Sequence, residues 1–310
     1  MEVTFLGTGG AVPTIQRNTS SILLRREGER FLFDVGEGTQ RQMMRFETGF
    51  GVSAIFLTHM HADHVLGLPG LLQTMEFNDR TDPLSIYVPA GTRGDIEELL
   101  DATATDPSYP LTIRNICPGD TALEHDEYTI QTFETDHRTR SIGYALVERD
   151  RKGRFDRERA EELGVPVGPK FRQLHQGTPV ELDDGTVIDP EQVVGPPRPG
   201  RRVVYTGDTR PTASTESVAT NADLLIHDAM FTHNRVERAQ QTRHSTVREA
   251  AKLAVEADVE RLALTHISSR YATDIEPLAE SATDIFGSNA FFPDNGDSIS
   301  IQYDDVRSKG

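Results

Sequence analysis

Leu57-Thr58-His59-Met60-His61-Ala62-Asp63-His64 is the stretch that decides how this 310-residue chain folds and what chemistry it carries. It places three imidazoles and a carboxylate within six residues, directly after the apolar run 54–57. That run is short and favours β-structure, so we predict a buried strand that ends at the cluster. On a turning loop, His59 and His61 can converge on one metal ion while Asp63 and His64 point to a second. Such ligands are typical of hydrolytic zinc, whereas a polar loop without metal is the weaker interpretation.

Length and composition limit the class of protein. A chain of 310 residues can bury a large core, either as one α/β domain or as two fused halves. It contains no apolar span of 18 residues, and the segment 1–6 has no basic region before its apolar stretch, so we expect neither a membrane protein nor an exported one. Cys117 is the one cysteine, which excludes an intrachain disulfide and a thiolate zinc cluster. We therefore expect a cytoplasmic protein whose metal site uses His and Asp.

The charge of the chain is strongly acidic. A net charge of -17 argues against a nucleic-acid partner, because Lys and Arg carry phosphate binding. Only four of the 32 basic residues are lysines, however: Lys152, Lys170, Lys252 and Lys309. This composition resembles that of proteins from salt-accumulating archaea, where molar salt screens charge repulsion within about 3 Å. On this interpretation the acidic composition is an adaptation to a salty solvent and says nothing about the ligand. An ordinary acidic protein from a GC-rich genome is the alternative.

Histidine or aspartate follows several further predicted strands. His137 follows the strand 128–133, Asp208 the strand that starts at Arg202, and His266 the strand 262–264, while Asp228 ends the run 222–228. Amphipathic helices are predicted between these strands, at 66–77, at 95–102, after a capping box of Thr246 and Glu249, and after a cap of Thr273 and Glu276. Asp34, at the end of the hairpin 21–34, is a candidate to orient a metal-bound histidine, or else a turn residue. Two similar halves that meet at one site are therefore expected.

The segment 149–200 breaks this pattern. Residues 149–172 hold eight basic and five acidic side chains, a net charge of +3 in an acidic chain. Gly164, Pro166, Gly168 and Pro169 then interrupt any helix. We interpret the segment as an inserted arm that can meet a polyanion, whereas a solvated loop of mixed charge is the alternative.

Together these motifs resemble the ribonuclease Z family, the tRNA 3' endonucleases of the metallo-β-lactamase superfamily. The resemblance rests on the His59 cluster with His137, Asp208 and His266 in that order, on Phe5 to Gly9, on Phe33 to Gln40, and on Thr265 to Tyr271. It implies one α/β domain over residues 1–310, a four-layer αβ/βα sandwich, with 149–200 as a flexible tRNA-binding exosite arm. A β-CASP insertion has no room between Asp208 and His266.

The resemblance also implies a mechanism. Two zinc ions per subunit would be held by seven residues, one by His59, His61, His137 and Asp208, the other by Asp63, His64, Asp208 and His266. The implied activity is zinc-dependent removal of the 3' trailer from precursor tRNA, by attack of activated water after the discriminator nucleotide, which leaves a 3'-hydroxyl. Asp63 would accept the water's proton. His244, oriented by Asp228, would protonate the leaving oxygen; a histidine that caps a helix start is the alternative.

Substrate contacts and partners follow from the same resemblance. Precursor tRNA would be bound by Arg17, Asn18, Arg151, Lys152, Arg154 and Lys170, and a homodimer is expected, with the arm reaching the partner subunit. Ile15 replaces the lysine of the family's Pro-x-Lys-x-Arg-Asn loop, and His227-Asp228-Ala229-Met230 departs from His-Glu-Ala-Thr, whereas His244-Ser245-Thr246 is intact. The departure at Ile15 leaves open how the protein senses a 3' CCA end and whether it spares tRNAs that carry one. A small-molecule phosphodiesterase or arylsulfatase of the same superfamily, and a non-catalytic RNA-binding protein, are the competing hypotheses.

Overall fold

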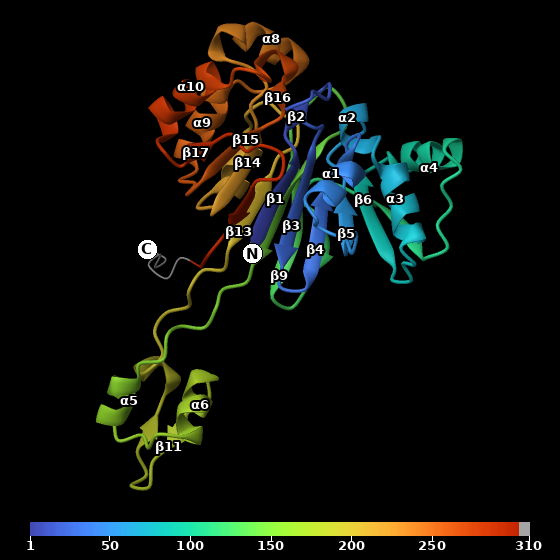
Figure 1. Ribbon diagram of the computed structural model, residues 1–310. Helices are drawn as coiled ribbons and strands as arrows, with labels where there is room; N and C mark the ends of the chain where they lie inside the picture. The colour runs from blue at the N-terminus through green and yellow to red at the C-terminus, as the bar shows by residue number, and fades with distance from the viewer. Residues whose placement is uncertain (304–310) are drawn as a thin grey trace. The chain divides into compact units, whose positions relative to one another are not determined.

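The chain divides into two compact units. The computed structural model describes residues 1–303 (Figure 1). The first unit comprises Met1–Val147 and Arg202–Gln302, and the second comprises Glu148–Arg201 together with Tyr303. Within residues 1–303, no helix has both the length and the apolar character that a bilayer crossing needs.

Two seven-stranded sheets form the centre of the first unit. In spatial order the first sheet contains β18 (Ser298–Ser300), β1 (Glu2–Gly7), β3 (Ser21–Arg26), β4 (Glu29–Phe33), β5 (Ala54–Phe56), β6 (Leu84–Pro89) and β7 (Leu111–Ile116). The second contains β17 (Ala290–Phe291), β15 (Leu262–Thr265), β14 (Leu224–Asp228), β13 (Arg202–Tyr205), β10 (Ile142–Glu148), β9 (Tyr128–Glu134) and β8 (Thr121–Glu124). A parallel pair, β2 (Gly9–Gly10) and β16 (Ile267–Ser268), joins the N-terminal half to the C-terminal half.

Helices cover the outer faces of both sheets. Along the first half of the chain they are α1 (Thr39–Arg45), α2 (Ala62–Val65), α3 (Leu68–Phe77) and α4 (Arg93–Ala102). Along the second half they are α7 (Ala213–Ala219), α9 (Val247–Glu256) and α10 (Glu276–Phe286), with the 3-10 turn η3 (Ser269–Tyr271) before α10. The 3-10 turn η2 (His233–Arg235) leads into α8 (Val236–Thr242), which packs instead through Ala239 on Met230 and Phe231.

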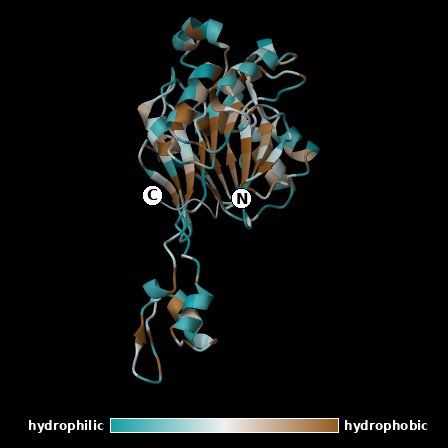
Figure 2. Ribbon diagram, turned by 90° about the vertical axis from the view of Figure 1, so that its left-hand side faces the viewer, coloured by the Kyte–Doolittle hydropathy of each residue, from teal (hydrophilic) through white to brown (hydrophobic). Residues whose placement is uncertain are grey.

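The period-two alternation of the strands builds the layers. In β4, Phe31 and Phe33 join a core that contains residues of both sheets, whereas Leu32 joins a second core with residues of α3 and α4. A third core packs Leu225 and Leu264 of the other sheet against α9 and α10. Apolar residues accordingly lie along the strands, and hydrophilic ones on the outside (Figure 2). The order helix, sheet, sheet, helix confirms the predicted four-layer sandwich.

Local boundaries show where the predictions were right and where they were wrong. The capping box of Thr246 and Glu249 is present at the start of α9. The predicted cap of Thr273 and Glu276 is wrong, because α10 begins at Glu276 after Ile275, with a proline in its first turn that needs no N–H partner. The predicted helix 66–77 is present as α3 but begins two residues later, at Leu68, after Gly67, where a Cβ atom would lie 2.1 Å from the carbonyl oxygen of Gly36.

The second unit is a folded module with a core of its own. It contains α5 (Arg157–Glu162), α6 (Pro169–His175), the hairpin of β11 (Val180–Glu181) and β12 (Val187–Ile188), and the 3-10 turn η1 (Pro190–Gln192). Its buried apolar side chains include those of Ala160, Val165, Leu174, Val180, Ile188 and Val193. Gly164, Pro166 and Gly168 lie between the two helices, as their helix-breaking character requires, whereas Pro169 is the first residue of α6, a position where proline is favoured.

Candidate metal centre

All seven predicted metal ligands lie on short connections after strands, and the fold brings them together. His59 and His61 follow β5, and Asp63 and His64 form the first turn of α2. His137 lies between β9 and β10, Asp208 follows β13, and His266 follows β15. Their ligand atoms form two groups that share Asp208. Within each group, all of these atoms lie within 4.8 Å of one another.

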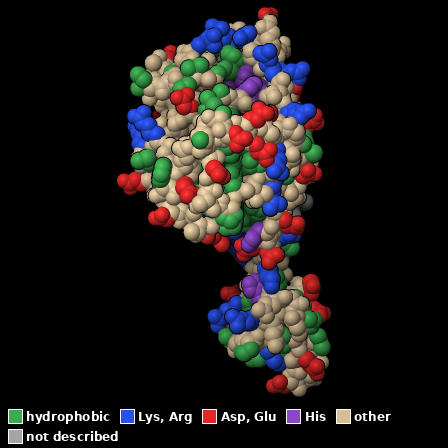
Figure 3. Space-filling model, turned by 90° about the vertical axis from the view of Figure 1, so that its right-hand side faces the viewer, with side chains coloured by type: hydrophobic (Ala, Val, Ile, Leu, Met, Phe, Trp, Pro, Cys, Tyr) green, Lys and Arg blue, Asp and Glu red, His purple; other side chains and the backbone are tan. Residues whose placement is uncertain are grey.

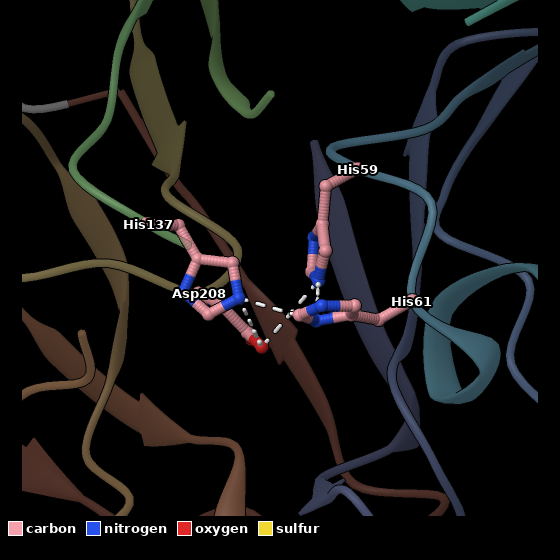
Figure 4. Close-up of side chains that lie close together, drawn as sticks. All are labelled: His59, His61, His137 and Asp208. Atoms are coloured by element: carbon pink, nitrogen blue, oxygen red, sulfur yellow. Dashed lines mark hydrogen bonds and ion pairs between the residues drawn. The ribbon is translucent and has the colours of Figure 1, made fainter. Parts of the chain in front are cut away.

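The first group contains His59, His61, His137 and Asp208, whose side chains point toward one another (Figure 4). His61 Nδ1 lies 3.0 Å from His59 Nε2 and 3.2 Å from His137 Nε2. Asp208 Oδ2 lies 3.6 Å from His59 Nε2 and 3.8 Å from His137 Nε2. Ligands held 2.0–2.1 Å from a tetrahedral zinc lie roughly 3.3 Å apart, so the observed separations suit that ion.

The second group uses the other oxygen of Asp208. Asp208 Oδ1 lies 3.3 Å from His64 Nε2 and 3.2 Å from His266 Nε2. Asp63 Oδ2 lies 3.2 Å from His266 Nε2, 3.6 Å from His64 Nε2, and accepts the N–H of Ala11 at 2.7 Å. Each oxygen of Asp208 thus faces one group, which is the arrangement that a shared ligand needs.

The protonation of these side chains also fits bound cations. Burial lowers the pKa of His59, His61 and His137, so their nitrogen lone pairs remain available. Burial would also lower the pKa of His64, but Asp208, Asp34 and Asp63 raise it well above its ordinary value. His64 Nε2 is a buried atom without a hydrogen-bond partner among residues 1–303, and it faces oxygens of Asp208 and Asp63, so a metal ion bound between these atoms would satisfy all three.

Asp34 orients the second group from behind. Its Oδ2 lies 2.7 Å from His64 Nδ1 and accepts the hydroxyl of Tyr205 at 2.8 Å, while its Oδ1 accepts the N–H of Thr58 at 2.8 Å. The structure thus places Asp34 against His64, one of the predicted metal ligands. Asp34 and His266 both have a positive φ, 56° and 59°, which costs backbone energy and is typical of functional sites.

Tyr205 is a site residue that the sequence did not reveal, and its hydroxyl can be tested. Tyr205→Phe removes a donor from a buried carboxylate, so we expect the free energy of unfolding to fall by about 1.5–3 kcal/mol. Zinc affinity should fall about tenfold or more, because Asp34 would hold His64 less firmly. The matched control is Tyr144→Phe, whose hydroxyl donates to the carbonyl of Leu57 at 2.8 Å. Zinc titration should show weaker binding in the first variant only; equal weakening in both would contradict this role for Asp34.

A second network holds His244 beside the cluster. His244 Nδ1 lies 2.8 Å from Asp228 Oδ2 and 4.0 Å from Asp208 Oδ2, and its ring stacks on that of His266. Asp228 also accepts the N–H groups of Thr209 and Met230. Burial would lower the pKa of His244, but Asp228 raises it to about 9, so the imidazole is protonated at neutral pH. Because Nδ1 faces Asp228, Nε2 is the nitrogen that can give a proton to a substrate.

The predicted substrate-binding residues lie in different environments. The guanidinium of Arg17 is buried and donates to Thr8, to the carbonyl of Pro293 and to Asp294, so it supports its loop and is not free for a ligand. Asn18 lines a cavity described below.

The predicted arm contacts lie in the second unit. Arg151 stacks on Tyr303 at 3.6 Å, and Lys170 donates to the carbonyl of Glu181, whereas Lys152 and Arg154 have exposed side chains. Residues 148–201 hold ten basic and eleven acidic side chains in total, so the positive charge is confined to the first part of the arm. Figure 3 shows basic and acidic side chains interspersed on one face of each unit.

Comparison with known proteins places this centre in a family. The model of the anti-Pycsar protein Apyc1 family matches residues 1–152, and that of the beta-lactamase superfamily domain matches residues 192–267. Ribonuclease Z of Natronomonas pharaonis is 63% identical over 305 residues, which cover 98% of this chain and 99% of the relative. Ribonuclease Z of Haloferax volcanii is 59% identical over 310 residues, which cover 100% of this chain and 98% of the relative. The crystal structure of human tRNase Z, short form, is 27% identical with a TM-score of 0.71, covering 97% of this chain and 100% of that one. With these identities over its whole length, the chain belongs to the ribonuclease Z family and has the metallo-β-lactamase fold.

Proposed function

We propose that this chain is a zinc-dependent endoribonuclease that removes the 3' trailer from precursor tRNA. Cleavage would follow the discriminator nucleotide and leave a 3'-hydroxyl on the tRNA. The observation that carries the proposal is Asp208, whose two oxygens each face one group of histidines. The names of the relatives support the choice of tRNA over a small-molecule phosphodiester.

Each side chain of the centre has a separate task. Zinc ions bound by the two groups would activate water and stabilise the charge that develops on the phosphodiester. Burial would raise the pKa of Asp63, but His64 and His266 hold it well below its usual range, so Asp63 is ionised at neutral pH, and it would accept the proton of the activated water. His244, protonated and oriented by Asp228, would donate a proton to the departing 3'-oxygen.

The wider setting of the enzyme is part of the proposal. The basic residues of the arm, Arg151, Lys152 and Arg154 among them, would hold the body of the tRNA by its shape. A cytoplasmic homodimer, with the arm serving the partner subunit, is inferred from the family. The haloarchaeal relatives and the net charge of -17 favour an enzyme that folds and works at high salt.

The decisive experiment is cleavage of an end-labelled precursor tRNA across a salt series. We expect cleavage after the discriminator, loss of activity on dialysis against a chelator, and recovery with zinc. Hydrolysis of a chromogenic phosphodiester without cleavage of precursor tRNA would favour a small-molecule hydrolase instead. Binding of precursor tRNA without turnover at any metal concentration would support the non-catalytic alternative.

A further inference from the structure

A loop leads from the metal centre to a cavity. Ala11, at one end of the loop, donates its N–H to Asp63 Oδ2 at 2.7 Å. Thr14, Ile15 and Asn18, further along, line a cavity of about 630 Å³. Because three residues of chain span at most about 10 Å, the cavity begins close to the centre.

Two arginines of α1 line the same cavity and have no ionic partner. Arg41 and Arg45 are one helical turn apart, so their side chains project from the same face. Among residues 1–303, neither side chain makes a hydrogen bond or an ion pair, and the guanidinium of Arg45 only stacks on the ring of Phe46 at 5.3 Å. Glu37 is the one carboxylate of the lining. The cavity thus offers an excess of positive charge in an acidic protein.

The cavity also carries an apolar surface. Ile15 is 97% exposed, so its apolar side chain is available for contact with a ligand. Unpaired guanidinium groups beside an exposed apolar side chain match the two chemistries of a single-stranded RNA, its phosphates and the faces of its bases.

We propose that this cavity binds the 3' trailer of the precursor, with Arg41 and Arg45 against trailer phosphates and Ile15 against a base. The inference rests on the proposed function. His244 contacts His137 and His266, and the tRNA body would be attached through the oxygen that His244 protonates. The remaining strand is the trailer. Loop 11–18, which contacts Asp63 through the N–H of Ala11, leads from the centre to the cavity and offers this strand a path.

The test compares trailers of two lengths. The substrates are a precursor tRNA with a single-nucleotide trailer, which ends near the metal centre, and one with a long trailer, assayed at the lowest salt that retains the native circular dichroism spectrum. The double variant Arg41→Ala with Arg45→Ala should lower kcat/KM roughly tenfold for the long trailer only. Loss of two phosphate contacts should also make the slope of log kcat/KM against log salt shallower by about 1.4.

The control removes the same charge from another helix. Arg248→Ala with Lys252→Ala changes two exposed cations one turn apart on α9, which do not line this cavity. We expect the control variant to have the same kcat/KM relative to the wild type for the short trailer as for the long one. Equal kcat/KM in the α1 variant and in the wild type, or an equal loss with both trailers, would overturn the proposal.

Failure of the proposed function would look different. In that case the wild type would hydrolyse a chromogenic phosphodiester but neither precursor. The affinity for a single-stranded RNA oligonucleotide, measured by fluorescence anisotropy, would then decide: weaker binding by the α1 variant supports the RNA-binding cavity, and unchanged binding overturns it.

Discussion

Asp208→Asn is expected to remove most of the bound zinc and to reduce cleavage of precursor tRNA by a factor on the order of 10³–10⁴. The substitution keeps the volume of the side chain but replaces one oxygen with an NH₂ group and removes the negative charge. One of the two ligand groups then faces a hydrogen-bond donor, whichever way the amide turns. Metal ions contribute several kcal/mol to such a reaction, and each 1.36 kcal/mol is a factor of ten in rate, which gives the expected loss.

The measurement is elemental analysis of the purified variant together with its rate on end-labelled precursor tRNA. Asp223→Asn is the matched control, because Asp223 is another buried carboxylate, directly before β14, and accepts the N–H of Arg202 at 2.6 Å. It should lower stability but keep the wild-type zinc content. Normal zinc and normal cleavage in Asp208→Asn would show that this residue is not the shared ligand. Zinc loss in both variants would instead point to unfolding.

The sequence was informative where local pattern and site chemistry coincide. A short apolar strand followed by His or Asp could be recognised at His59, Asp208 and His266. His59 follows a strand of one sheet and the other two follow strands of the second sheet, and the ends of these strands meet where the two sheets pack together. The four-layer sandwich was expected from the resemblance to a family, and its physical basis is the alternation within strands such as β4, whose two faces carry different apolar residues.

The residues that support the site could not be identified from local pattern. Tyr205 lies in an apolar strand and has the pattern of a core residue; only the packing of the two sheets brings its hydroxyl to Asp34. Arg17 and Arg41 show the converse. The motif suggested Arg17 for RNA, but its guanidinium is buried against Thr8 and Asp294, while Arg41 has the pattern of an ordinary exposed helix residue and lines a cavity. Such roles depend on tertiary contacts between segments that are far apart in sequence.

His244→Ala is expected to affect RNA and an activated phosphodiester very differently. The departing oxygen of RNA is an alkoxide that needs a proton, so removal of the acid should lower kcat on precursor tRNA by roughly 10²–10⁴. A nitrophenolate leaves without a proton, so hydrolysis of a bis-nitrophenyl phosphodiester should change little.

The pair of substrates separates proton donation from metal binding, because loss of zinc would slow both reactions. Asp228→Asn should show the same selectivity with a smaller loss, since the raised pKa of His244, about 9, depends on the charge of Asp228 at 2.8 Å. The rate of each variant on the two substrates, together with its zinc content, is the measurement. An equal loss on both substrates at wild-type zinc content would mean that His244 stabilises the phosphodiester itself, and full activity on RNA would mean that another group supplies the proton.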